Sequence, residues 1–329
     1  MPHPTLTWEA SNLQAFTVAG TNSTPAELLL AVKDAIDNLS EKWEVSDYDA
    51  TDGTLEIKRK AADAPTGELA TARFLLFGGQ VPHANALAVN LAAANTHLYA
   101  AMSVDANTTG PSTSYAAGAP YASKCVLGQM VTANNAIQAA DSPRVSLVES
   151  ADALAIWLGD SSTWCSVIFG RVIIAAADDS LMWGVLASCG ARGNVTTSGN
   201  MDSTASGGQS PLPLLSGSGG IPRGGYWNTT LGQFRACGRA ISLTTTIGTD
   251  PGIGGNAAPS TLIPVPVLES TNTLSSPTQS FLGYLRQIRL GPQAQHVQTM
   301  RDADGDEIAI HFGPPNGVSG WGCWFDQAQ

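Results

Sequence analysis

Few residues of this chain have the type and spacing that chemistry requires, and Ser161 is the first candidate. It follows Gly159 and Asp160 at the end of an expected strand. A serine becomes a nucleophile only when a general base lies within hydrogen-bonding reach. The sequence offers neither a base nor an orienting acid at a suitable position. We therefore expect Ser161 to lie in a strand-ending turn and to have no catalytic role.

The motif at residues 159–162, Gly-Asp-Ser-Ser, resembles the Gly-Asp-Ser opening of SGNH-type hydrolases, in which the serine is the nucleophile. In that family the motif stands near the start of the domain, and an Asp-x-x-His pair stands at its end. Here the motif lies in mid-chain, and Asp306 and His311 have a different spacing within an expected hairpin. An esterase using Ser161 is therefore the third of the alternative functions considered below.

Metal and cofactor sites are not predicted. The acidic run at residues 302–307 is similar to a calcium loop, but the EF-hand pattern needs a later glycine and a distant glutamate. Gly305 follows Asp304 directly, which is typical of a hairpin turn, and weak cation binding stays open. The five histidines stand singly and the five cysteines are widely spaced, so zinc is not expected. The glycine-rich stretches lack the lysine of a phosphate-binding loop.

Composition excludes several classes of function. Charged residues make up 13% of the chain, about half of the ~25% that is usual in soluble domains. The net charge of −11 argues against direct nucleic-acid binding, which needs clustered lysine and arginine. No apolar run approaches the ~20 residues of a membrane helix, and the N-terminus does not have the pattern of a signal peptide. We expect neither a nucleic acid nor a membrane as partner.

Lysine stops at Lys124. The 205 residues that follow contain none, yet they hold nine arginines between Arg144 and Arg301. Lysine is depleted at protein–protein interfaces, where arginine and aromatic residues are enriched. This distribution favours a subunit whose surface is covered by neighbours. A genomic bias toward arginine codons is the competing explanation.

The opening of the chain predicts a small α+β domain at residues 1–77. Strands are expected at 5–10 and 13–18, and then a helix begins with Thr24 as N-cap, Pro25 at the first helical position and Glu27 completing a capping box. Apolar residues recur at helical spacing up to residue 39. A hairpin at 43–60 and a strand at 73–77 follow. Because its local signals agree, we expect this unit to fold alone.

The rest of the chain predicts antiparallel β-structure, as sheets or a β-sandwich. Residues 78–142 form a connecting segment with one expected strand at 98–104, and residues 143–329 form a β domain. Strands are expected at 144–148, 153–158, 164–175, 181–187 and 281–290, with a hairpin formed by 297–301 and 307–312 and an aromatic cluster at the end.

Residues 190–260 are rich in Gly, Ser, Thr, Asn and Pro and almost free of charge. A structureless loop of that length is uncommon inside a compact domain. The segment is therefore either an extended arm ordered by neighbours or a series of short strands. Its large apolar residues and arginines are the candidate interaction residues: Arg223, Tyr226, Trp227, Phe234, Arg235 and Arg239.

The overall pattern is similar to the virion structural proteins of tailed bacteriophages. The resemblance rests on the helix and hairpin at residues 24–60 with Trp43, on the low-charge strands at 153–187, and on the closing strand and hairpin at 284–312. Proteins of this kind form tails, baseplates, head–tail connectors and capsid surfaces. The resemblance implies a virion subunit assembled in the host bacterial cytoplasm, with other virion proteins and copies of itself as partners.

We therefore expect a non-enzymatic structural subunit of the tail or baseplate region. A capsid or vertex decoration protein is the alternative of the same class. A glycan-binding adsorption module is the alternative of another class, with Trp164, Trp227, Trp321 or Trp324 as stacking surfaces. Those tryptophans would have to be exposed, whereas core tryptophans are buried, so tryptophan burial distinguishes a glycan-binding module from a structural subunit.

Overall fold

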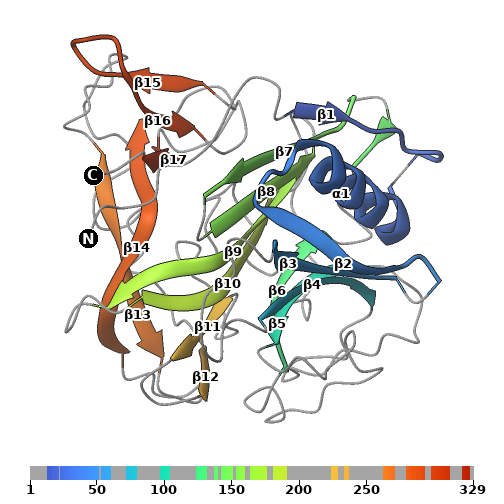
Figure 1. Cartoon of the computed structure of the whole chain (residues 1–329), viewed down its shortest axis with the longest axis horizontal. Coiled ribbons are helices and arrows are strands. Elements are labelled where there is room, and N and C mark those ends of the chain that lie inside the picture. The colour runs from blue at the N-terminus through green and yellow to red at the C-terminus, as the bar shows by residue number, and fades with distance from the viewer. Residues whose placement is uncertain are drawn as a thin grey trace.

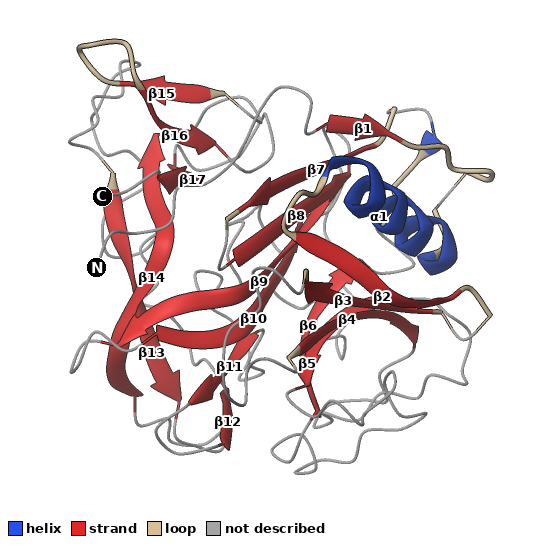
Figure 2. Ribbon diagram, in the orientation of Figure 1, coloured by secondary structure: helices blue, strands red, loops and turns tan. Residues whose placement is uncertain are grey.

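The computed structural model describes residues 13–21, 23–51, 53–60, 72–79, 97–103, 124–131, 137–139, 142–150, 153–159, 164–175, 181–190, 224–228, 233–236, 262–270, 279–292, 298–311 and 321–326. These residues form one α-helix and antiparallel β-sheets (Figures 1 and 2). The elements are α1 (Pro25–Leu39) and the strands β1 (Leu13–Ala15), β2 (Trp43–Asp49), β3 (Thr54–Arg59), β4 (Arg73–Gly79), β5 (His97–Ser103), β6 (Lys124–Val131), β7 (Arg144–Glu149), β8 (Ala153–Gly159), β9 (Trp164–Ala175), β10 (Leu181–Gly190), β11 (Gly224–Asn228), β12 (Gln233–Ala236), β13 (Ile263–Ser270), β14 (Gln279–Pro292), β15 (Thr299–Arg301), β16 (Glu307–His311) and β17 (Trp321–Asp326). The predicted mainly β fold with an N-terminal helix is confirmed.

Helix α1 begins where the sequence predicts. The Thr24 hydroxyl accepts a hydrogen bond from the backbone N–H of Glu27 at 3.2 Å, and the Glu27 carboxylate accepts one from the backbone N–H of Thr24 at 2.7 Å. Pro25 stands at the first helical position, where its missing N–H would have no helical partner in any case. The helix ends at Ser40, whose N–H still bonds the carbonyl of Ile36. Its buried face contains the apolar residues that recur at helical spacing.

The first sheet has the order β2-β3-β4-β5-β6, and its neighbouring strands are antiparallel. The hairpin between β2 and β3 turns at Gly53, whose φ of 65° is a conformation that glycine adopts without steric cost. The last two strands, β5 and β6, come from beyond residue 77. The sheet of the predicted N-terminal unit is therefore completed by the following segment.

The second sheet is branched and centres on the long strand β9. On one side β9 pairs with β10, which continues through β11 to β12. On its other side β9 pairs first with β8, followed by β7 and β1, and then with β14 over residues 173–175. The pairing of β8 with β9 stops at Ala153, opposite Gly170, and β14 then pairs with residues 173–175 of β9 on the same side. From there β14 continues to β17, β16 and β15, while β13 lies along its other edge (Figure 1).

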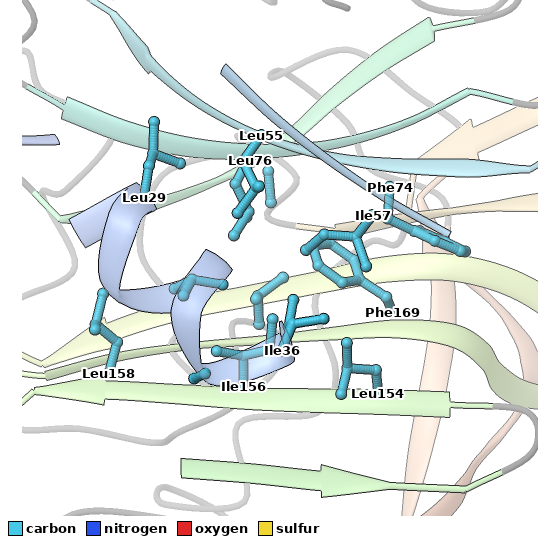
Figure 3. Packing of buried hydrophobic residues seen from close by; sticks show 14 of the residues in the cluster. Leu29, Ile36, Leu55, Ile57, Phe74, Leu76, Leu154, Ile156, Leu158 and Phe169 are labelled. Atoms are coloured by element: carbon cyan, nitrogen blue, oxygen red, sulfur yellow. The ribbon is translucent and has the colours of Figure 1, made fainter. Parts of the chain in front are cut away.

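The main core lies between the first sheet and strands β7 to β9, with α1 in the same space (Figure 3). Phe74 of β4 stacks on Phe169 of β9 with ring centroids 5.1 Å apart, and it also contacts Trp43 edge to face. Leu29 and Ile36 of α1 belong to the same cluster. This shared core joins residues before 77 to residues after 143. Its burial stabilises both parts, because apolar burial contributes about 25 cal/mol per Å².

Residues 145–149 of β7, strand β8 and residues 167–170 of β9 are buried on both faces. Successive side chains of a strand point to opposite faces of the sheet, and the side chains on one face lie in the main core. The other set, which points away from that core, is also buried: Ser146, Val148, Ala155, Trp157 and Ile168. The all-apolar sequence of β8, Ala-Leu-Ala-Ile-Trp-Leu, follows from this central position.

Most predicted elements lie within one to three residues of the observed ones. Strands β6, β11 to β13 and β17 are not individually predicted, and the strand expected at 5–10 lies outside the described residues. The boundaries of three domains, at 1–77, 78–142 and 143–329, stay predictions. The independent folding of residues 1–77 also stays a prediction; their core continues into β7 to β9 and their sheet into β5 and β6.

Candidate functional site

A buried polar junction joins the end of α1 to the turn between β7 and β8. Glu149, which is 5% exposed, stands at the end of β7. One of its carboxylate oxygens accepts a hydrogen bond from the Ser40 hydroxyl at 2.5 Å and a longer one from the N–H of Lys42, and the other accepts from the N–H of Glu41 at 2.8 Å. The Ser40 hydroxyl also accepts from the N–H of Trp43 at 2.9 Å. The carboxylate thereby satisfies backbone donors just beyond the helix.

The same turn contacts β2 on one side and β14 on the other. The Trp43 indole N–H donates to the carbonyl of Ser150 at 3.3 Å. The Ser150 hydroxyl accepts from the N–H of Ala153 at 3.0 Å and donates to Oε1 of Gln287 at 3.4 Å. We call Ser40, Trp43, Glu149 and Ser150 the polar junction. It is the point where the first sheet, the β7–β8 turn and β14 meet.

The polar junction suits a structural role better than a catalytic one. Both oxygens of Glu149 are occupied by donors of the same chain, and the carboxylate and the Ser40 hydroxyl are buried. A general base must reach a proton of the substrate, and these groups face their own backbone. What they can do is hold three elements in one arrangement, because buried donors without acceptors are costly.

The acidic run at residues 302–307 forms the predicted hairpin turn. One oxygen of Asp302 accepts hydrogen bonds from the N–H groups of Asp304 at 3.0 Å and Asp306 at 2.9 Å. Gly305 has a φ of 91°, which favours glycine. Arg301 bonds the carbonyl of Gly305 and forms an ion pair with Glu307. Within the described residues, no three His, Cys, Asp or Glu side chains come together in a way that could hold a metal ion.

Four of the six predicted interaction residues lie in one hairpin. Tyr226 and Trp227 belong to β11, and they stand opposite Arg235 and Phe234 of β12. Part of the 190–260 segment is therefore made of short strands, which is one of the two forms considered for it. Trp227 also stands opposite Trp183 of β10. Arg223 and Arg239 lie outside the described residues, so their role as interaction residues stays a prediction.

Two arginines of the lysine-free region, Arg289 and Arg301, bond within their own chain. A guanidinium nitrogen of Arg289 lies 3.0 to 3.2 Å from the carbonyl oxygens of Leu285, Arg286 and Ile288. Arg301 closes the acidic turn. Arg301 makes its two contacts from two nitrogens of its planar group, which the single nitrogen of a lysine does not reproduce. Part of the preference for arginine is thus explained by intramolecular contacts, without a neighbouring subunit.

An exposed aromatic pair was not predicted as a site. Phe281 is 48% exposed and Tyr284 is 44% exposed, and their rings meet edge to face with centroids 5.1 Å apart. Residues three apart in a regular strand point to opposite faces. Here the register of β14 against β13 shifts between the pairs Leu268–Phe281 and Val267–Gly283, which inserts one extra residue. This bulge allows both rings to lie on the surface.

Of the four tryptophans proposed as glycan-stacking surfaces, Trp324 has a described side chain. Trp324 is 2% exposed and its ring contacts His311 edge to face, so the proposal that Trp324 stacks on a glycan is wrong. Trp43 and Trp157 are buried as well. The side chains of Trp164, Trp227 and Trp321 are outside the described part of the structure, and their role stays a prediction.

Ser161 lies outside the described residues, so its lack of a catalytic role also stays a prediction. In the part of the chain that the structure covers, no helix is long and apolar enough to cross a membrane. Comparisons with known protein families, with characterised proteins and with solved structures gave no match.

Proposed function

We propose that this chain is a non-enzymatic structural subunit of a bacteriophage virion, located in the tail or baseplate region. It assembles in the bacterial cytoplasm with copies of itself and with other virion proteins. The observation that carries this proposal is the exposed pair Phe281 and Tyr284 in the lysine-free part of the chain. The sequence resemblance to tailed-phage virion proteins supplies the setting.

The aromatic pair has the chemistry of an interface anchor. Aromatic residues are enriched at protein–protein interfaces, and Tyr is frequent among the residues that contribute most to binding. The two rings already contact each other, so little conformational freedom is lost when a partner covers them. Pro266 of β13 stands opposite Tyr284 in the ladder. Covering this surface desolvates apolar groups.

The interior of the subunit supports a mechanical role. Residues 145–149 of β7, strand β8 and residues 167–170 of β9 are buried on both faces, and the polar junction fixes three elements by hydrogen bonds of Glu149 and Ser150. A subunit that transmits force to its neighbours needs such a stiff interior. Catalysis would instead need a base with access to a substrate.

Two alternatives use the same aromatic surface. A capsid or vertex decoration protein would bury it at another place in the particle. A glycan-binding adsorption module would stack a sugar on it, although rings inclined by 72° do not form one flat platform. The esterase alternative depends on Ser161 and not on this surface.

The test is a double substitution, Phe281→Ser with Tyr284→Ser, in the full-length protein. Analytical ultracentrifugation measures the assembly state, and electron microscopy of particles measures incorporation. We expect the wild type to assemble and the double variant to lose at least about tenfold in association, because two anchors of this kind contribute more than 1.4 kcal/mol together. Leu30→Ser is the matched control, since Leu30 is 45% exposed on the charged face of α1.

A wild-type protein that stays monomeric and is absent from particles would overturn the proposal. If the double variant assembles normally but loses binding to a glycan array, the adsorption module is correct instead. Labelling of Ser161 by a fluorophosphonate probe, with ester hydrolysis lost in Ser161→Ala, would establish the esterase.

A further inference from the structure

Strand β14 changes its partners at one bend. Up to residue 285 it lies between β13 and β9, and from residue 288 it lies between β13 and β17. Five steps along β14, from Tyr284 to Arg289, correspond to only two steps along β13, from Pro266 to Pro264. Three residues of β14 are therefore extra relative to β13. We call residues 286–287, which lie between the two ladders, the β14 bend.

Arg289 contacts backbone carbonyls of the bend and of the residues that flank it. Its guanidinium lies 3.2 Å from the carbonyl oxygen of Leu285, 3.0 Å from that of Arg286 and 3.1 Å from that of Ile288. Charge-assisted hydrogen bonds are stronger than neutral ones. One side chain thus holds the backbone of the bend in a single conformation.

The strands beyond the bend have a core of their own. Met300, Ala309 and Trp324 form a cluster with Leu262 and Ile308, and none of these residues belongs to the main core. In Figure 1, strands β15 to β17 lie apart from the first sheet and from α1. We call residues 288–292, 299–311 and 321–326 the C-terminal lobe.

Strand β13 pairs with β14 on both sides of the bend, and the other described connections between the main body and this lobe are narrow. The ladder between β9 and β14 has three residue pairs, at Gly283, Tyr284 and Leu285, and all of them precede the bend. The hydrogen bond from Ser150 to Gln287 reaches the bend itself at 3.4 Å. Units joined through few contacts move or open separately unless something fixes the connection.

We propose that the β14 bend is a hinge between the main body and the C-terminal lobe, and that the Arg289 guanidinium locks it. With the lock in place, the lobe keeps one angle to the body. When the contacts of Arg289 with the three carbonyls are lost, the lobe opens or rotates while the main core stays folded. The device is independent of the proposed virion role, since it rests on β14 and on the separate lobe core.

The test measures native-state hydrogen exchange by mass spectrometry on the full-length protein. In Arg289→Lys, which keeps the charge but not the planar donor group, amides of the lobe should exchange about tenfold faster, as expected when charge-assisted hydrogen bonds are lost. Amides of β7 and β8 should be unchanged. Arg301→Lys is the matched control, because Arg301 lies in the lobe and bonds only described groups of the exposed turn.

The wild-type protein provides a second measurement that does not depend on a variant. At low denaturant the lobe should exchange through an opening of lower free energy than the opening that exposes β7 and β8. The proposal is overturned if lobe and body exchange through the same opening in the wild type. It is also overturned if Arg289→Lys leaves lobe exchange unchanged or accelerates exchange in the body equally.

Discussion

Glu149 illustrates how a single buried carboxylate can determine the arrangement of distant segments. It follows an expected strand, and its position beside an acidic turn gives no sign of its partners. Its carboxylate oxygens accept hydrogen bonds from the Ser40 hydroxyl and from the backbone N–H groups of residues 41 and 42, more than a hundred positions earlier in the chain. Because these donors lie where water has little access, their satisfaction depends on this one side chain.

We predict that Glu149→Ala lowers the free energy of unfolding by about 3 kcal/mol, because the Ser40 hydroxyl and two backbone N–H groups lose an ionised acceptor. Chemical denaturation monitored by tryptophan fluorescence measures this. Glu44→Ala is the control, since Glu44 is an exposed partner of Lys58 and such pairs contribute about 0.5 kcal/mol. Equal effects of the two substitutions would show that the polar junction adds nothing to stability.

Glu27 gives a prediction about pH. Partial burial by itself raises the pKa of Glu27, but hydrogen bonds from the N–H groups of Ala19 and Thr24 outweigh it and hold the pKa below 4.5. A lowered pKa in the folded state stabilises the fold above pH 4.5, and this contribution is lost as the pH falls through the folded-state value. The capping box should therefore weaken in acid.

The measurement compares unfolding of the wild type and Glu27→Gln at pH 7 and at pH 3. We expect the wild type to be more stable at the higher pH and the difference to shrink at the lower one. Asp34→Asn on the same helix is the control. A difference that is the same at both pH values would mean that the ionised form of Glu27 has no special role in the cap.

At the scale of elements, the sequence predicts what depends on neighbouring residues. Thr24, Pro25 and Glu27 specify the start of α1 because all capping contacts lie within four positions. Asp304 and Gly305 specify the β15–β16 turn for the same reason. Strand β13 is missed because Pro264 and Pro266 interrupt the usual strand pattern, although prolines are tolerated where a strand lies at an edge.

The candidate sites depend on contacts that no local pattern contains. The sequence indicates a strand at residues 281–290, but the surface position of Phe281 and Tyr284 results from a register shift against β13. The hydrogen-bond partners of Glu149 are equally hard to predict, because its burial and pairing follow from the packing of α1 and the two sheets. The sequence does not distinguish the hairpin of β11 and β12 from an extended arm, since short strands in a Gly- and Thr-rich segment have no clear periodicity.

The first sheet leads to a prediction about fragments. A fragment of residues 1–79 would lack the strands that cover β4 and would expose Phe74, which stacks on Phe169 in the intact protein. We expect it to show no cooperative thermal transition, whereas a fragment of residues 1–175 should melt cooperatively because it retains the main core. A sharp transition of the shorter fragment, followed by circular dichroism, would instead establish an independent N-terminal domain.

At the scale of the whole molecule, the unequal distribution of lysine and arginine has two physical explanations. Arg289 and Arg301 use the guanidinium group for contacts within the chain, and lysine could not replace these contacts fully. The arginines at 223, 235 and 239 belong to a segment with few acidic residues. If this segment docks on a neighbouring subunit, their partners are carboxylates or carbonyls of that neighbour.

We predict that replacing Arg223, Arg235 or Arg239 by Ala weakens assembly by about 2 kcal/mol or more for each arginine buried at a contact. This corresponds to a roughly 30-fold loss in association, which sedimentation of the purified protein and its incorporation into particles can measure. Arg301→Ala is the matched control, because its guanidinium bonds Gly305 and Glu307 of its own chain. If the three variants assemble as well as this control, these arginines serve no interface. The absence of lysine after residue 124 then reflects codon bias and intramolecular hydrogen bonding, and the argument for a covered surface rests on Phe281 and Tyr284 alone.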